Sequence, residues 1–372
     1  MSENKFQPPV HGDSRFAHID AMRAFAVLVV VLAHAGLGRI VPGGSGVTIF
    51  FTISGFVITY IVLRESDSTG SFSASRFYRN RAYKILPPLV IAIIVPTLIW
   101  SIWNFLDWTA FLGQILFYYN WVKVSGGADV LPGTGVVWSL SIEEQFYVIF
   151  ALLWLCLVRT KFRILYLGIA AAICATVSMV LRIVLYVSDA PAERIYYGSD
   201  TRLDGLAFGV LLAIGYNSWL KRGGRRTKFI NVLGHSATLW SAVVLYILSL
   251  IIRDEFFRST FRYSIQGLAA CLVIMYGLVP GEGWSRKAFY SLAKFRPIAI
   301  IGLASYSIYL CHLVIGAWLL SILDDFPFVV SFFVAVSVGI LVGIGLYKWV
   351  EVPVQRIKRN RSAKAPAHAV RN

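Results

Sequence analysis

Arg23-Ala-Phe-Ala-Val-Leu-Val-Val-Val-Leu-Ala-His34 is the stretch that decides the fold, because it places ten apolar residues in a row between a cation and an imidazole. Similar apolar runs of about 17 to 25 residues recur along the 372-residue chain, and each is long enough to cross the hydrocarbon core of a bilayer as a helix. The composition agrees, since 57% of the residues are hydrophobic and only 15% are charged. The sequence therefore predicts an all-α, polytopic transmembrane helical bundle.

Eleven apolar stretches compete for the status of a membrane-spanning helix. The stretch from Thr109 to Asn120 has only twelve residues and is rich in aromatic side chains, which favours an interfacial or re-entrant segment. Ten spans remain, at residues 24–40, 47–63, 85–103, 137–158, 163–187, 203–219, 237–252, 261–279, 298–323 and 328–350.

The distribution of basic residues predicts the orientation of these ten spans. With both termini in the cytoplasm, the cytoplasmic segments hold 26 of the 35 Lys and Arg residues and the external segments hold 6. Short basic loops are translocated poorly, so this asymmetry favours the topology and explains most of the net charge of +16 without nucleic acid.

The pattern of apolar spans and basic residues divides the chain into three parts. Residues 1–23 form a cytoplasmic segment without a cleaved signal peptide, 24–350 form the transmembrane domain, and 351–372 form a basic tail. We expect that tail to be disordered and to lie near anionic lipid. No metal site is expected, since the four cysteines lack paired ligand spacing and no zinc or phosphate-loop motif occurs in the sequence.

Ionisable residues within spans are costly and mark candidate functional sites. Eleven helical steps separate Arg23 from His34, which returns to within about 20° of the same face and about 16 Å further along the axis. A thin donor molecule with phosphates at Arg23 would reach His34, whose imidazole suits general-base catalysis. The alternatives are a His34 bonded to a neighbouring helix and an Arg23 that anchors the helix at the interface.

Two adjacent carboxylates lie in the segment Trp138-Ser-Leu-Ser-Ile-Glu-Glu-Gln-Phe-Tyr147. Consecutive helical residues point about 100° apart, so only one carboxylate can readily face His34. We predict that Glu144 orients the imidazole, and Glu143 remains the alternative partner or a substrate-binding group.

Further polar residues extend this candidate site. The cluster Arg76-Phe-Tyr-Arg79-Asn-Arg81-Ala-Tyr-Lys84 suits phosphate binding, with membrane anchoring as the alternative reading. The candidates for acceptor binding are Asp200, Arg202, Asp204 and His312. Pairing between Arg202 and the two aspartates, or a packed polar contact for His312, would explain the same residues structurally.

Five segments, taken together and in order, resemble the acyltransferase-3 family of membrane-bound O-acyltransferases, which modify exopolysaccharides, O-antigens and peptidoglycan. They are Arg23 with His34, Phe50-Phe-Thr-Ile-Ser-Gly-Phe56, the basic run ending in Leu-Pro, the Trp138 segment, and Ser305-Tyr-Ser-Ile-Tyr-Leu-Cys-His312. The resemblance covers nearly the whole chain. Lys84 departs from it, because the family's paired-arginine pattern would favour Arg there, which leaves Arg79 or Arg81 for that role.

The resemblance implies an enzyme of the bacterial inner membrane that takes acetyl-CoA from the cytoplasm and acylates a glycan or glycolipid hydroxyl at the far side. Arg23 and the basic run would hold the CoA phosphates, and His34 with Glu144 would form the catalytic centre. The implied partners are acyl-CoA, the acceptor, membrane lipid and glycan-assembly proteins, without a tightly bound cofactor. Because the chain ends soon after its last predicted helix, we expect it to act alone or with a separate partner.

Two other readings of the same residues stay open at this stage. A transporter or flippase for a glycolipid or small molecule would use His34, Glu144 and Arg182 along its path. A scaffold for glycan assembly would need no chemistry at His34. Within the acyltransferase reading, His34 acts either as a general base or as a transiently acylated nucleophile.

Overall fold

The structure is a computed structural model that describes residues 10–11 and 15–364. The predicted terminal segments lie outside the described residues at 1–9, 12–14 and 365–372. Two strands pair antiparallel, β1 (Val10–His11) and β2 (Arg15–Phe16). The helices are α1 (Ala17–Leu32), α2 (Gly44–Thr69), α3 (Ala74–Leu89), α4 (Val95–Trp100), α5 (Trp108–Ile115), α6 (Tyr119–Val124), α7 (Val137–Leu157), α8 (Arg163–Val187), α9 (Ala192–Tyr197), α10 (Leu203–Lys221), α11 (Lys228–Gly234), α12 (Ser236–Ile251), α13 (Glu255–Ser259), α14 (Phe261–Leu278), α15 (Trp284–Lys294), α16 (Arg296–Leu303), α17 (Ser305–Ile322), α18 (Phe328–Leu346) and α19 (Val352–Lys364).

The number of membrane spans agrees with the prediction. Within the described residues, nine helical segments are long and apolar enough to cross a membrane, and α11 with α12, bent by 58°, makes a tenth. The chain is therefore a multi-pass membrane protein whose spans are all helical. The bounds differ in places, since α1 begins at Ala17 and continues the predicted first span seven residues toward the N-terminus.

The aromatic segment at 109–120 forms two short helices instead of a span, as predicted. Asp107 caps α5 by accepting hydrogen bonds from the backbone N–H groups of Thr109 and Ala110. The chain then turns at Phe117, whose φ of 59° lies in the left-handed region and separates α5 from α6. Neither helix is long enough to cross hydrocarbon.

In the C-terminal third, one predicted span begins too early and the predicted disorder of the tail is wrong over residues 352–364. The predicted span at 298–323 is broken at Ala304, because α16 turns away to pack on α1, where Gly302 lies against the backbone of Asp20. The predicted disordered tail is helical over α19, and Gln355 donates a hydrogen bond to the carbonyl of Tyr83 on α3 at 3.4 Å. Arg, Lys and Ala are good helix formers, so this basic segment continues α18 through a π-helical turn.

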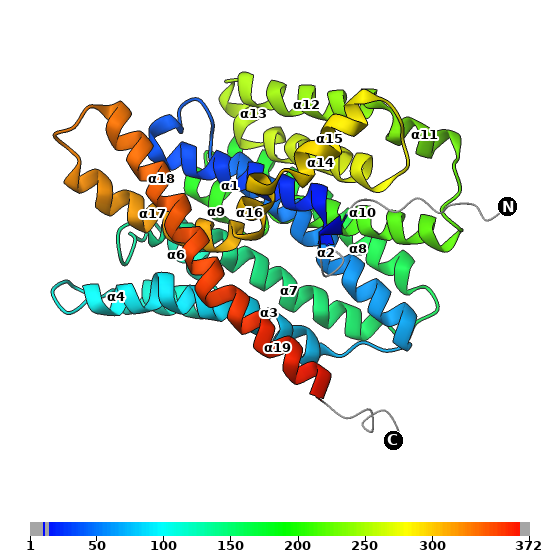
Figure 1. Ribbon diagram of the computed structural model, residues 1–372, viewed down its shortest axis with the longest axis horizontal. Coiled ribbons are helices and arrows are strands. Elements are labelled where there is room, and N and C mark those ends of the chain that lie inside the picture. Colours follow the sequence, from blue (N-terminus) through cyan, green and yellow to red (C-terminus); the bar gives the residue numbers. More distant parts are fainter. Residues whose placement is uncertain (1–9, 12–14, 365–372) are drawn as a thin grey trace.

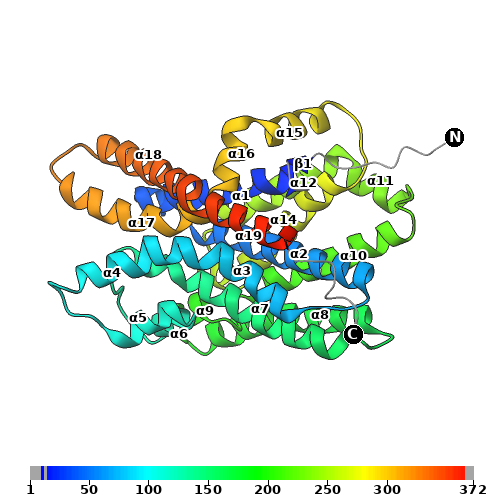
Figure 2. The same cartoon turned by 60° about the horizontal axis from the view of Figure 1, so that its bottom comes forward.

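The helices run between two ends of the molecule (Figures 1 and 2). The α7–α8 and α10–α11 connections lie at the right-hand end, whereas the α17–α18 connection and the end of α4 lie at the left. At the centre, α2 and α10 approach closely through glycines: a Cβ on Gly55 would lie 2.0 Å from the carbonyl oxygen of Leu206.

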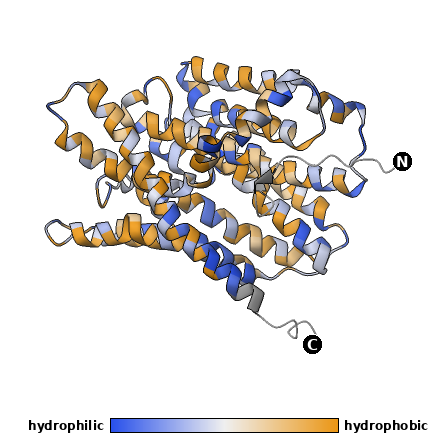
Figure 3. Cartoon of the chain, in the orientation of Figure 1, coloured by the Kyte–Doolittle hydropathy of each residue, from blue (hydrophilic) through white to orange (hydrophobic). Residues whose placement is uncertain are grey.

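The outer faces of the bundle are apolar, as a lipid-facing surface requires. Figure 3 shows hydrophobic residues over α4, α8 and α18, whereas α19 is mainly hydrophilic. On α8 the exposed residues repeat every three or four positions, at Leu165, Ile169, Ile173, Val177, Val180 and Val184. Polar chemistry is therefore confined to the bundle interior and the two ends.

Candidate active site

His34 lies where the first helix changes its geometry. The α-helical hydrogen bonding of α1 ends at Leu32, and residues Ala33–Leu37 form a π-helical turn in which Gly36 has a φ of 121°. Such π-turns widen the helix and frequently occur at functional sites. Here the turn brings His34 against α17, where its Nδ1 atom lies 3.0 Å from Nε2 of His312.

The hydrogen bonds of His312 determine which nitrogen of His34 is free. Nδ1 of His312 lies 2.8 Å from the carbonyl oxygen of Tyr309 and 3.2 Å from that of Ile308. A carbonyl oxygen only accepts, so in the neutral pair His312 donates from Nδ1 and accepts at Nε2. His34 must then donate from Nδ1, which leaves the lone pair of its Nε2 available for a proton or an acyl group. We call His34 and His312 the histidine dyad.

Polar and aromatic residues from other motifs surround the dyad. Ser139 Oγ and the Tyr309 hydroxyl lie 2.7 Å apart, one turn of α17 before His312. The ring of Phe50 contacts Tyr309 edge-on with 6.0 Å between ring centroids. Three segments that are far apart in the sequence therefore meet beside the dyad. Ser139 and Tyr309 were not singled out from the sequence, although both lie inside the quoted motifs.

The predicted pairing of His34 with Glu144 is not the contact that the structure shows. Glu144 instead accepts a hydrogen bond of 2.6 Å from Nη2 of Arg81. The Arg81 guanidinium also stacks on the ring of Tyr147, 3.3 Å from its centroid. This geometry follows from α7 facing α3 at this level, and a catalytic role for Glu144 stays a prediction.

Glu143 lies in the same polar region but points to α2. It accepts hydrogen bonds from Ser54 Oγ at 3.1 Å and from the Tyr147 hydroxyl at 3.3 Å. Arg23 is near enough to act on Glu143 electrostatically. We call Arg23, Arg81, Glu143 and Glu144 the charged cluster, which joins three helices on the side of the dyad from which α1 begins.

The remaining residues predicted to bind the donor differ in their exposure and in whether they already have partners within the protein. Arg79 on α3 is exposed, and neither Arg79 nor Arg23 forms an ion pair within the described part of the chain. Lys84 is half-buried and has partners of its own. Two arginines are thus open to an anionic ligand, while Arg81 is held in place by Glu144.

The aspartates near Arg202 pair with other arginines. Asp200 binds Arg194 through both carboxylate oxygens, at 2.8 and 2.5 Å. Asp204 binds Nη2 of Arg182 at 2.7 Å, and both side chains are buried. The alternative that Arg202 pairs with these aspartates is therefore wrong. Arg202 is 1% exposed and has no carboxylate partner among the described residues.

Arg182, the residue proposed for a transport path, is fully buried. Its guanidinium donates to the carbonyl oxygens of Thr201 and Thr260 and to the side chains of Asp204 and Ser264. A guanidinium with this many fixed partners braces helices together and has little freedom to exchange ions. In the part of the chain that the structure describes, no three His, Cys, Asp or Glu side chains gather as metal ligands.

Comparison with known proteins connects this geometry to an enzyme family. Residues 16–348 match the family model described as an acyltransferase domain. A Staphylococcus aureus (strain COL) protein named provisionally as an O-acetyltransferase is 29% identical over 352 residues, and O-acetyltransferase OatA of S. aureus (strain NCTC 8325) is 25% identical over 349. Each alignment covers 91% of this chain but 57% of the relative. No solved structure matches the chain.

Proposed function

Because the chain belongs to the acyltransferase-3 family, we propose that it transfers an acetyl group from acetyl-CoA to a hydroxyl of a cell-surface or secreted glycan. The histidine dyad is the observation that carries the proposal, since it leaves Nε2 of His34 unprotonated in the interior of a membrane protein. On this proposal the enzyme lies in the bacterial inner membrane with both termini cytoplasmic, which the distribution of basic residues supports.

The reaction uses the free lone pair of His34. Nε2 accepts the proton of the glycan hydroxyl while the hydroxyl oxygen forms a bond to the thioester carbonyl carbon. The tetrahedral intermediate collapses, the C–S bond breaks, and the proton held by His34 passes to the CoA thiolate. The products are the acetylated glycan and free CoA. The same lone pair also permits a two-step order in which Nε2 first takes the acetyl group and then yields it to the hydroxyl.

The donor approaches from the side of the charged cluster. Arg23 precedes His34 by eleven residues, about 16 Å along a helix, so an extended donor held by its phosphates at one end reaches the dyad with the other. Arg79 and Arg23 supply free positive charge for the phosphates, and Glu144 fixes Arg81 in one orientation. Glu143 and Glu144 would then position cations instead of reacting with substrate.

Replacing Arg79 by alanine should raise the KM for acetyl-CoA about tenfold and leave kcat unchanged, since a charge-assisted hydrogen bond contributes about 1.5–3 kcal/mol. The measurement is acetyl-CoA turnover by the protein in proteoliposomes that contain bacterial glycans. The matched control is Arg222→Ala, an exposed arginine beyond the end of α10. A wild-type protein that neither binds nor consumes acetyl-CoA would overturn the proposed function and favour glycolipid transport.

Replacing His312 by alanine should lower kcat about 100-fold with little change in the KM for acetyl-CoA, because His34 then lacks the acceptor that fixes its tautomer. His312→Gln should recover part of the loss, since an amide oxygen can accept the hydrogen bond from Nδ1 of His34. The readout is the separate determination of kcat and KM for both variants. Equal losses in the Ala and Gln variants would indicate a packing role alone.

A further inference from the structure

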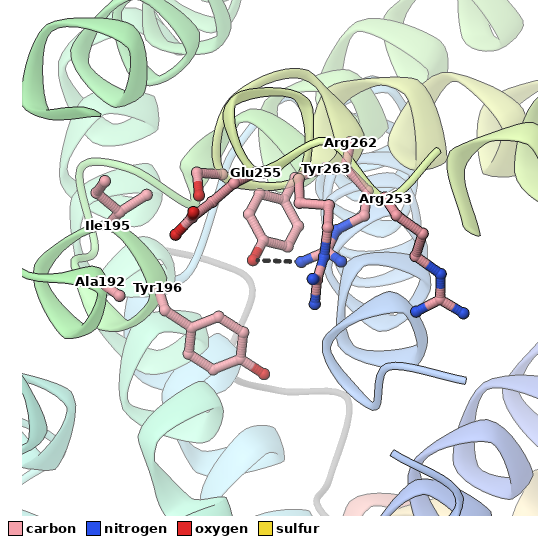
Figure 4. Close-up of a pocket in the computed structure, with 9 residues that line it drawn as sticks. Ala192, Ile195, Tyr196, Arg253, Glu255, Arg262 and Tyr263 are labelled. Atoms are coloured by element: carbon pink, nitrogen blue, oxygen red, sulfur yellow. Dashed lines mark hydrogen bonds between the residues drawn. The ribbon is translucent and has the colours of Figure 1, made fainter. Parts of the chain in front are cut away.

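A cavity of about 350 Å³ lies between α9, α13 and the start of α14, away from the charged cluster (Figure 4). This volume falls within the range of about 300–1,000 Å³ that is usual for small-ligand sites. Its walls include Tyr196, Arg253, Glu255, Arg258, Arg262 and Tyr263. We call this cavity the arginine pocket.

The arginine pocket carries an excess of positive charge. Three arginines and one carboxylate, Glu255, line it, and within the described residues none of the four forms an ion pair. The guanidinium of Arg253 donates to the carbonyl oxygen of Arg39 at 2.8 Å. Arg262 is only 8% exposed and donates to the Tyr263 hydroxyl at 3.1 Å. Its buried Nε has no hydrogen-bond partner in the described part of the chain. A buried donor without a partner is costly, which indicates a ligand that would complete it.

A fourth guanidinium, that of Arg202, lies behind the tyrosine rings of the pocket wall. Arg202 lies 3.7 Å from the ring centroid of Tyr263 and 5.3 Å from that of Tyr196. It donates to Thr48 Oγ1 at 3.3 Å, while its Nη1 lacks a partner among the described residues. Burial lowers the pKa of Arg202, so the surroundings do not fully compensate its charge. The two rings therefore separate the cavity from another unpaired cation.

The pocket adjoins the histidine dyad. A Cβ on Gly44 would lie 2.8 Å from the hydroxyl of Tyr196, a pocket residue. A Cβ on the preceding Gly43 would lie 3.9 Å from Cε1 of His34. One backbone turn, at Gly43 and Gly44, therefore separates the two sites.

The arginines in and behind the pocket lie on the external side in the predicted topology, whereas most basic residues of the chain lie on the cytoplasmic side. In the predicted topology only six basic residues lie outside, and Arg202, Arg253 and Arg258 are three of them. External arginines gain nothing from the rule that keeps positive loops inside. Their concentration around one cavity needs another cause, and binding of an anion supplies it.

We propose that the arginine pocket binds an anionic group, a carboxylate or a phosphate, of the acceptor glycan and thereby presents a neighbouring hydroxyl to His34. This inference rests on the proposed function for its catalytic part, but anion binding is testable alone. Guanidinium groups bind carboxylate and phosphate oxygens through paired hydrogen bonds, and the adjacent tyrosine rings suit the face of a sugar.

The test is equilibrium binding to the full-length protein in detergent with three probes. Tetragalacturonate represents a carboxylate-bearing sugar, its methyl ester is the neutral match, and glucose 1-phosphate represents a phosphate source. Tetragalacturonate or glucose 1-phosphate should bind wild type at least about tenfold more tightly than the methyl ester, the size expected for one charge-assisted contact. Which anion binds identifies the source of the charge.

The variants distinguish the pocket from general attraction to a basic protein. Arg258→Glu, at an exposed position on the pocket rim, and Arg262→Gln should each weaken anion binding at least about tenfold. The matched control Arg222→Glu, outside the pocket, should leave it unchanged. Equal binding of the ester and the acid, no binding of any probe at millimolar concentration, or equal losses in all three variants would overturn the inference. If the wild-type protein binds the anion but does not consume acetyl-CoA, the result would instead count against the proposed function.

Discussion

Replacing His34 by alanine is expected to lower the kcat of acetyl transfer by about 10²- to 10⁴-fold, which is the usual contribution of a positioned general base. Nε2 of His34 is the free nitrogen of the dyad, because Nδ1 is committed to His312 and His312 is committed to backbone carbonyl oxygens. Binding of acetyl-CoA should stay near the wild-type value, since its phosphates are proposed to bind at the charged cluster. The measurement is kcat together with equilibrium binding of labelled acetyl-CoA.

The control for His34→Ala is His235→Ala. His235 is exposed in a connection between two helices, where its Nδ1 accepts from the backbone N–H of Ala237. This variant should keep full activity. If His34→Ala retains more than a tenth of the wild-type kcat, the lone pair of His34 does not carry the chemistry. Rapid quenching of the wild type without acceptor then separates the two orders of reaction, because only the two-step order leaves an acetyl group on His34.

Much of the fold follows from the sequence because each span is a local feature. The run from Arg23 to His34 is long and apolar enough to be recognised alone, and the short segment at 109–120 fails the same length test. The break at Ala304 has no such signal, since alanine is the best helix former and the break arises from the packing of α16 on α1.

The candidate site shows where sequence reasoning stops. His34, Glu144 and His312 were each recognised as polar residues that a membrane interior tolerates only for a reason. Which of them touch depends on how helices rotate and pack, and His34 and His312 are 278 residues apart. Glu144 was predicted to orient His34, but in the structure it accepts a hydrogen bond from Arg81 on α3. The arginine pocket was missed because its residues come from α9, α13 and α14, with no shared motif.

Replacing Asp204 by alanine is expected to destabilise the protein by about 3–5 kcal/mol, the cost of leaving one partner of a buried ion pair unpaired. Arg182 and Asp204 are 0% and 2% exposed, and their ion pair is 2.7 Å long. Ser264 also donates to Asp204, so the substitution removes one acceptor from the Arg182 guanidinium and one from the Ser264 hydroxyl, and it leaves the buried charge of Arg182 without a counter-ion. The measurement is thermal unfolding of the detergent-solubilised protein.

Asp200→Ala is the matched control, because Asp200 also pairs with an arginine, Arg194, at 2.5 Å, but its side chain is 40% exposed. Water can solvate Arg194 after the change, so the expected loss is at most about 1 kcal/mol. A double variant, Arg182→Leu with Asp204→Leu, should recover part of the stability lost in Asp204→Ala, since neither charge of this pair is then left buried without its partner. Equal losses from Asp200→Ala and Asp204→Ala would mean that burial does not set the strength of these pairs, and Arg182 would return as a candidate for an ion or substrate path.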